Sequence, residues 1–190
     1  MTQRQSSLSF RLMALEFKIR DWLWPRRTIA EEAGIGPGMR VLDYGCGPGS
    51  YVVAVAEMVG ESGRVYALDS HPLAIVGIRR LRQHKSLANV ETILSDCRTG
   101  LGEGEVDIVL LHDVLHDVHT PRPLMRELHR VLKPEGVLSF SDRHMKEEEI
   151  VDCLTSDGLF CRLRRGRRTY SFSPLKPSPS DRIDGERAAE

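Results

Sequence analysis

The chain has 190 residues, of which 41% are hydrophobic and 28% charged, as suits one globular α/β domain with a buried core. Its 27 Lys and Arg balance its 27 Asp and Glu, and this zero net charge argues against a dedicated nucleic-acid binder. No apolar run reaches the roughly 18 residues of a membrane span, and the start of the chain lacks the apolar stretch of a signal peptide. The four cysteines form no CxxC pair, which favours reduced thiols and a cytoplasmic location.

The first part of the chain predicts two helices that cap the domain, within residues 1–34. The first, over 8–23, rests on apolar residues three or four positions apart, namely Leu8, Leu12, Leu15, Ile19 and Leu23. Pro25 suits a break before a second, short helix over 26–33, which would end near Gly34. The first helix is a candidate lid, because an acceptor pocket could be lined by Phe10, Met13, Phe17, Trp22 and Trp24.

After Gly38 the pattern changes to short apolar runs separated by helical stretches. The apolar runs predict strands over 40–44, 64–68, 90–94, 106–111 and 137–140. The helical stretches predict helices over 51–59, 72–83, 121–132 and 146–157. Strands that alternate with helices form a mostly parallel sheet, and continuous apolar runs are typical of strands buried on both faces.

The end of the chain differs in composition. Residues 159–172 carry arginine-rich arms on either side of Gly166 and predict an antiparallel hairpin at the sheet edge, where charge discourages edge-to-edge pairing. These arginines could also face RNA or an acidic substrate, although strand alternation sends neighbours to opposite faces. Residues 173–190 are rich in Pro, Ser and charge, so we expect a disordered tail. The predicted fold is α/β and Rossmann-like, a seven-stranded mostly parallel sheet with an antiparallel edge hairpin and helices on both faces, over residues 35–172.

The segment VLDYGCGPGSY joins the first predicted strand to the next helix. Its three glycines permit a tight turn and a close approach of backbone to a ligand, and the helix start offers unpaired N–H groups. A dinucleotide fingerprint is G-x-G-x-x-G, so the third glycine here comes one residue early. Asp43 would repel a pyrophosphate but can face the cationic methionine end of S-adenosylmethionine. Asp69, at the end of the second strand, suits the ribose hydroxyls of either ligand.

VLDYGCGPG resembles the first motif of class I S-adenosylmethionine-dependent methyltransferases. ALDSHP, LSDC and VDIVLLHDVLHDV resemble the next three motifs of that family in its order. LHRVLKPEGVLSFSD is similar to the stretch before the fifth strand in the ubiquinone/menaquinone-biosynthesis subgroup. The resemblance covers about residues 39–172. It implies S-adenosylmethionine as the cofactor and S-adenosylhomocysteine as the product.

The resemblance also implies which residues bind the two ends of the cofactor. The methionine portion would lie against the glycine turn, formed by Asp43, Tyr44, Gly45, Cys46, Gly47 and Gly49, with Tyr44 and Cys46 contributing mainly backbone. Asp69 would hold the ribose, and Ser70 and His71 would lie beside the ribose or adenine.

The resemblance places two further segments at the adenine end and over the pocket. Asp96 would accept a hydrogen bond from the adenine amino group, and Cys97 would donate its backbone N–H to the ring. His112 and Asp113, after the fourth strand, would close the pocket.

Three histidines lie in LHDVLHDVHTP, and on a helix this spacing would put His112, His116 and His119 on one face. One interpretation is a metal site, but no distant ligand is identified and no metal is predicted. A second is a general base, His112 or His116, that takes a proton from the acceptor. A third is a structural polar loop in which Asp113 or Asp117 caps the next turn. His144, after the fifth strand, is another candidate for the acceptor proton.

The function that these motifs imply is in-line methyl transfer to a small-molecule acceptor. Orientation supplies much of the catalysis and the sulfonium is already a good leaving group, so a base is not strictly required. No inserted substrate domain is present, so the acceptor would be recognised by the N-terminal helices, by short loops or by a second subunit, which leaves a homodimer open. The alternatives are a non-catalytic S-adenosylmethionine-binding module and a nicotinamide-dependent oxidoreductase, which the glycine spacing disfavours.

Overall fold

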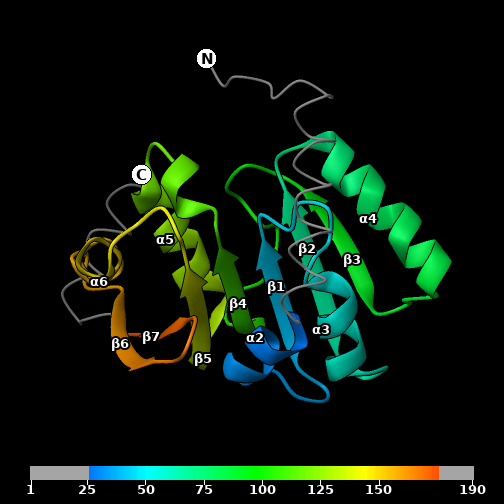
Figure 1. Cartoon of the computed structure of the whole chain (residues 1–190), viewed down its shortest axis with the longest axis horizontal. Helices are drawn as coiled ribbons and strands as arrows, with labels where there is room; N and C mark the ends of the chain where they lie inside the picture. Colours follow the sequence, from blue (N-terminus) through cyan, green and yellow to red (C-terminus); the bar gives the residue numbers. More distant parts are fainter. Residues whose placement is uncertain (1–25, 176–190) are drawn as a thin grey trace, which may run out of the picture.

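The computed structural model describes residues 26–175 (Figure 1). The predicted helix over 8–23, with its aromatic residues, lies outside the described residues. The described elements follow one another as α2 (Arg26–Glu32), β1 (Arg40–Tyr44), α3 (Val52–Val59), β2 (Arg64–Asp69), α4 (Pro72–Lys85), β3 (Val90–Leu94), β4 (Val106–His112), the 3-10 turn η1 (Leu115–Asp117), α5 (Pro121–Val131), β5 (Leu132–Ser141), α6 (Glu147–Thr155), β6 (Phe160–Arg165) and β7 (Tyr170–Pro174).

Seven strands form one sheet in the order β3-β2-β1-β4-β5-β7-β6. The first five of these are parallel, and β7 runs antiparallel to both β5 and β6. This confirms the predicted mostly parallel sheet with an antiparallel edge hairpin. The strand order reverses between β1 and β4, and in open α/β sheets ligands bind beyond the carboxyl ends of the strands at such a reversal.

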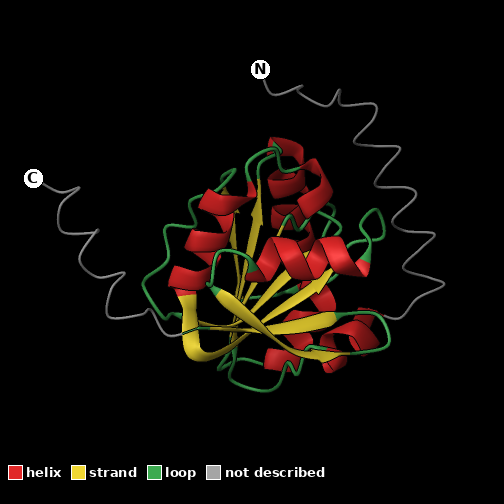
Figure 2. Cartoon of the chain, turned by 90° about the vertical axis from the view of Figure 1, so that its left-hand side faces the viewer, coloured by secondary structure: helices red, strands yellow, loops and turns green. Residues whose placement is uncertain are grey.

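Alternate residues of the central strands point to opposite faces of the sheet. Val41 of β1 packs in one core with α2, α3 and α4, whereas its neighbour Leu42 packs in a second core with α5 and α6. The same alternation continues along β2 and β4, and Figure 2 shows helices on both sides of the twisted sheet. Polar side chains at the strand ends follow this alternation, so Asp43 lies on the side of α2 and α3.

Several boundaries differ by one or two residues from those predicted, and the start of β5 and the end of β7 are two differences with a clear physical reason. Helix α5 ends at Val131 and β5 begins directly at Leu132, because Pro134 cannot continue a helix and Leu132 already pairs with Val106. The register of β5 against β4 then shifts between Val106 and Ile108, before the predicted strand residues 137–140 begin to pair with β4. Residues 173 and 174, which were expected in a disordered tail, belong to β7, because this strand extends to Pro174 through pairing with Phe160 of β6. Residues 176–190 of the expected tail lie outside the described residues.

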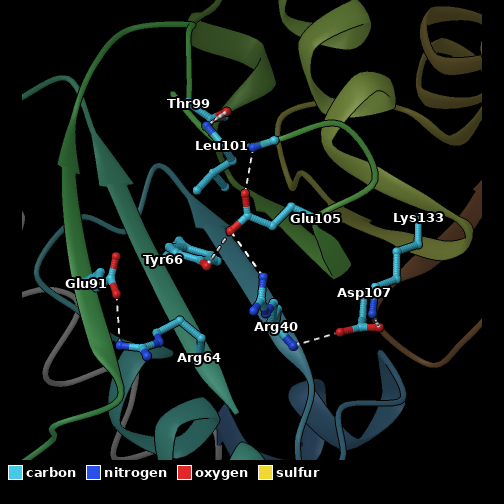
Figure 3. A network of polar contacts seen from close by, with 10 residues as sticks. Arg40, Arg64, Tyr66, Glu91, Thr99, Leu101, Glu105, Asp107 and Lys133 are labelled. Atoms are coloured by element: carbon cyan, nitrogen blue, oxygen red, sulfur yellow. Dashed lines mark hydrogen bonds and ion pairs between the residues drawn. The ribbon is translucent and has the colours of Figure 1, made fainter.

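A polar network at the amino end of the sheet fixes the segment that leads into β4 (Figure 3). Glu105 accepts hydrogen bonds from the Tyr66 hydroxyl at 2.7 Å and from the Arg40 guanidinium at 3.4 Å. Asp107 accepts from the Arg40 backbone N–H at 2.8 Å and from Lys133 at 2.5 Å. These bonds tie β1, β2 and β5 to the start of β4 and so fix the far end of the loop that follows β3.

We predict opposite effects of alanine at two glycines. A Cβ at Gly63 would lie 2.7 Å from the Met39 carbonyl oxygen and 2.8 Å from that of Val59, and backbone cannot yield as a side chain can. Gly63→Ala should therefore lower the free energy of unfolding by about 3 kcal/mol. Gly77, inside α4, has open space around it, so Gly77→Ala should raise that free energy by roughly 0.5–1 kcal/mol. Urea unfolding of both variants measures the two values, and equal effects would contradict the packing described.

Candidate functional site

The glycine turn follows β1 at the reversal of strand order. Gly45, Gly47 and Gly49 have φ angles of +75°, +52° and +89°, a region that side chains rarely adopt. The N–H groups of Gly45 and Cys46 both donate to the Leu68 carbonyl, at 2.8 and 2.9 Å, which fixes the turn to the end of β2. A Cβ at Gly45 would lie 2.4 Å from a methyl group of Val114. The turn is therefore packed directly against the segment that follows β4.

Asp69 connects this turn to the loop after β2. Its Oδ2 accepts from the Gly47 N–H at 2.8 Å and its Oδ1 from the His71 N–H at 2.7 Å. The His71 side chain caps α4 by accepting from the Leu73 N–H. Each carboxylate oxygen has a second lone pair, so Asp69 can accept hydroxyl hydrogen bonds without losing these contacts. The exposed Ser70 lies between them in the same loop.

The segment after β3 carries Asp96 and Cys97 to the same edge. The Tyr44 hydroxyl donates to the Asp96 carbonyl at 2.6 Å, and the Cys97 N–H donates to Ser95 Oγ at 3.3 Å. The Cys97 N–H thus has a partner within its own turn. Behind them, Thr99 donates to Glu127 of α5 through both its N–H and its hydroxyl, at 2.9 and 2.6 Å.

Three buried polar atoms around the glycine turn have no hydrogen-bond partner among the described residues. They are Oδ2 of Asp43, Oγ of Ser50 and Nδ1 of His112. Buried polar groups are nearly always paired in folded proteins, so this concentration marks a place where a polar ligand fits. Asp43 is 3% exposed, and His112 donates or accepts through Nε2 at 3.1 Å from Ser139 Oγ.

Arg26 links helix α2 to the polar side chains around the glycine turn. Its Nη1 donates to the Tyr51 hydroxyl at 2.8 Å, and its guanidinium carbon lies 4.7 Å from the centre of the Tyr51 ring. The Tyr51 ring in turn meets His112 edge-on, with 5.0 Å between ring centres. The sequence analysis did not identify Arg26, Ser50 or Tyr51 as site residues. Ser50 and Tyr51 directly follow the glycine motif and could have been included, whereas Arg26 carries no local signal.

Burial sets the charges of these groups. It raises the pKa of Asp43 to about 7, with Asp69 adding to the rise and Arg26 opposing it. It lowers the pKa of His112 to about 4, so this imidazole is neutral at neutral pH. A cation bound beside Asp43 would favour its carboxylate form, and the chemistry of the site therefore fits the ammonium and sulfonium of S-adenosylmethionine.

The predicted histidine cluster does not form one helical face. His112 ends β4, His116 lies in η1, and His119 lies beyond it in an exposed position. The capping role considered for Asp113 and Asp117 is wrong, because neither η1 nor α5 has a side-chain cap. Asp113 instead adopts φ +54° and its N–H donates to the Ser141 carbonyl at 2.7 Å. Within residues 26–175, no group of three or more His, Cys, Asp or Glu side chains is placed to hold a metal ion.

Comparison with known proteins gives the family. The profile described as "Methyltransferase domain" matches residues 35–161, about two thirds of the chain. A ubiquinone/menaquinone biosynthesis C-methyltransferase of Shewanella sp. (strain ANA-3) is 33% identical over 123 residues, which are 62% of this chain and 49% of that protein. The chain thus spans about half the length of this relative.

Solved structures agree with the sequence relatives. A SAM-dependent methyltransferase from Aquifex aeolicus is 25% identical, with a TM-score of 0.73 over 85% of this chain and 97% of that one. Coclaurine N-methyltransferase bound to N-methylheliamine and SAH is 26% identical, with a TM-score of 0.55 over 62% of this chain and 33% of that one. The fold and the glycine turn define a class I S-adenosylmethionine-binding domain. The chain belongs to the methyltransferase domain family, whose cofactor is S-adenosylmethionine.

We predict that Gly45→Ala weakens S-adenosylmethionine binding at least tenfold, because the new methyl group would push Val114 and the turn apart. Gly60→Ala is a matched control. Gly60 also has a positive φ, of +68°, but nothing lies within 4 Å of its Cβ position, so only backbone strain of about 1–3 kcal/mol is added. Calorimetric titration measures both affinities. Equal losses in the two variants would show that strain, and not the contact with Val114, matters.

A second prediction concerns acid stability. Hydrogen bonds from Arg130 and Thr99 lower the pKa of Glu127 to about 2, from an ordinary value of 4.5. A lowered pKa contributes stability that is complete above pH 4.5 and lost as the pH falls towards 2. Glu127→Gln should therefore unfold about 2 kcal/mol more easily at pH 7, with the difference from wild type shrinking below pH 4.5. Urea unfolding between pH 2.5 and 7 measures this, and the exposed Glu135→Gln should show no such pattern.

Proposed function

We propose that the chain transfers a methyl group from S-adenosylmethionine to a small-molecule acceptor by in-line displacement. The observation that carries this is the glycine turn at the strand reversal, with the buried carboxylate of Asp43 beside it, whose Oδ2 has no hydrogen-bond partner among the described residues. When bound, the cofactor supplies an electrophilic methyl group on a cationic sulfur. A curated relative is named for methyl transfer in quinone biosynthesis, which supports a small-molecule acceptor.

The methionine portion of the cofactor would lie in the polar pocket around the glycine turn. Its ammonium and sulfonium would face Asp43, and its carboxylate would face the Arg26 guanidinium, which lies close enough to Asp43 to affect its pKa. The backbone of the turn, including Tyr44, Cys46 and Gly49, would form the wall. This arrangement matches the two opposite charges of the ligand to two opposite charges of the site.

The nucleoside portion would extend from β2 towards β3. Asp69 would accept from the ribose hydroxyls with its remaining lone pairs, next to Ser70 and His71. Asp96 would accept from the adenine amino group, and Cys97 would meet the ring. Asp113 and His112 would border the methyl group, where the acceptor must approach.

A small acceptor is favoured in this proposal because several arginines of the basic hairpin are already engaged by neighbouring elements. Arg162 and Arg165 of β6 form ion pairs with Glu147, at 2.9 and 2.6 Å. Arg164 donates to the Glu32 carbonyl. These contacts favour an edge-protecting role of the hairpin and disfavour a nucleic-acid-binding surface.

No helix within residues 26–175 is long and apolar enough to span a bilayer. We retain the cytoplasm as the expected location, since the four cysteines of the chain are unpaired thiols. A homodimer also stays a prediction.

Binding and turnover test the proposal separately. Titration with S-adenosylmethionine and S-adenosylhomocysteine should give micromolar dissociation constants, and no binding of either would overturn it. Transfer of labelled methyl from the cofactor to a panel of phenols, quinols and amines then tests catalysis. Binding without transfer to any acceptor would favour the alternative of a non-catalytic module.

Proton release on binding tests the role of Asp43. Because bound positive charge lowers its pKa from about 7, wild-type protein should release roughly half a proton at pH 7. The affinity should rise with pH up to about 7 and level off above it. Calorimetry in buffers of different ionisation heats measures the release. Asp43→Asn should abolish it and weaken binding at least tenfold, whereas Asp152→Asn, at an exposed position of α6, should change neither. Unchanged proton release in Asp43→Asn would remove Asp43 from the site.

A further inference from the structure

Asp142, directly after β5, has a buried carboxylate that accepts hydrogen bonds from two residues, His116 and His144. Its side chain is 0% exposed. Its Oδ2 accepts from the His116 ring Nδ1 at 2.8 Å and from the His116 backbone N–H at 3.2 Å. Its Oδ1 accepts from the His144 backbone N–H at 3.0 Å. The carboxylate therefore fixes both the position of His116 and the orientation of its ring.

An ionised carboxylate only accepts hydrogen bonds, so Nδ1 of His116 must carry the proton and Nε2 keeps its lone pair. Nε2 lies 3.6 Å from Oδ2 of Asp117, beyond hydrogen-bond distance, and the Asp117 side chain is 77% exposed. The His144 ring packs on the His116 ring with 4.4 Å between centres. Three titratable groups, Asp117, Asp142 and His144, lie beside this ring. The His116 side chain is 26% exposed, so protons can exchange with solvent.

The 3-10 turn η1 carries His116 to the rim of the cofactor pocket. Val114, two residues earlier, packs against Gly45 of the glycine turn. Asp113, one residue further back, is bonded through its N–H to the end of β5. His116 thus lies two residues from a contact with the glycine turn and is bonded to Asp142, at the edge of the sheet from which an acceptor must approach.

The other two histidine candidates have different surroundings. His112 is buried, its Nε2 is paired with Ser139, and its pKa is lowered to about 4, which makes it a weak base at neutral pH. His144 is an exposed residue, as His116 is, but its backbone, not its ring, is bonded to Asp142. Of the three, His116 alone has a carboxylate that fixes its tautomer.

We propose that His116 is the general base of the methyl transfer, with Asp142 as its positioning residue, and that the acceptor is a protic nucleophile such as a phenol, quinol or amine. This rests on the proposed function. The acceptor atom forms a bond to the methyl carbon as the carbon–sulfur bond breaks, with its electron pair going to sulfur. The acceptor proton passes to Nε2 of His116. The resulting imidazolium is stabilised by Asp142 and then loses its proton to solvent.

The tautomer of His116 is measurable without an acceptor. Long-range 1H–15N spectra of the imidazoles should show His116 protonated at Nδ1 when it is neutral, and Asp142→Asn should remove this preference. A neutral ring protonated at Nε2 in wild-type protein would overturn the proposal, because no lone pair would then face the acceptor.

Kinetics test the base directly. With catechol, methylhydroquinone and a primary amine as acceptors, His116→Gln should lower kcat by roughly 10²–10⁴-fold, with little change in acceptor KM. The pH dependence that the base imposes on kcat/KM should be lost in this variant. Asp142→Asn should lower kcat less, by about tenfold or more. His119→Gln is the matched control, at an exposed histidine of the same loop, and should leave activity unchanged.

The outcomes separate this inference from the proposed function. S-adenosylmethionine affinity in His116→Gln should stay within about twofold of wild type, since the cofactor contacts lie elsewhere. Wild-type kcat and an unchanged pH profile in His116→Gln would overturn the base assignment while leaving the methyltransferase intact. A wild-type protein that binds the cofactor but methylates none of these acceptors would overturn the acceptor class. If wild-type protein binds no S-adenosylmethionine, the proposed function itself is overturned.

Discussion

The parallel pairing of β1 with β4 brings together Asp43, the glycine turn and His112 of the candidate site. Asp43 lies opposite Leu110 in this pair, and His112 follows on the same face two residues later. After β1 the chain continues to β2 on one side of this pair, and after β4 it continues to β5 on the other side. No crossover helix therefore covers the carboxyl ends of the two strands. The glycine turn and η1 both start from this gap and pack on each other through Gly45 and Val114. A shift of register between the two strands would separate the carboxylate, the turn and the histidines at once.

The fold could be predicted from the sequence because its signals are local and periodic. The run from Arg40 to Tyr44 and the run from Val90 to Leu94 became strands with the predicted bounds. The first is buried from its second residue onward, as a central strand covered on both faces should be, whereas only Val90 of the second is buried, because that strand lies at the sheet edge. The junction at Leu132 was not predictable in the same way. Its assignment depends on pairing with Val106 across the sheet, which helical periodicity within residues 121–132 does not contain.

The candidate site was predictable where one motif carries it and not where tertiary contacts build it. The glycine turn and Asp69 are found by spacing alone. The pairing of His116 with Asp142 joins two loops that are 26 positions apart, and Arg26 reaches Tyr51 over 25 positions, so neither contact has a sequence signature. The charge of Asp43 is likewise a property of its burial, which no local pattern states. Sequence therefore identified the cofactor, whereas the candidate acid–base group required the three-dimensional structure.

The two ends of the cofactor site have unequal mechanical support. In the proposed site, the nucleoside end would rest on a loop braced by Tyr44 of β1 and by Glu127 of α5, two elements that pack in the second core. The methionine end would be completed by Arg26, in the first turn of the seven-residue helix α2. Short elements with few buried contacts open at lower free energy than a sheet does. Exchange of spent for fresh cofactor could then proceed by local opening at α2, leaving the nucleoside platform intact between turnovers.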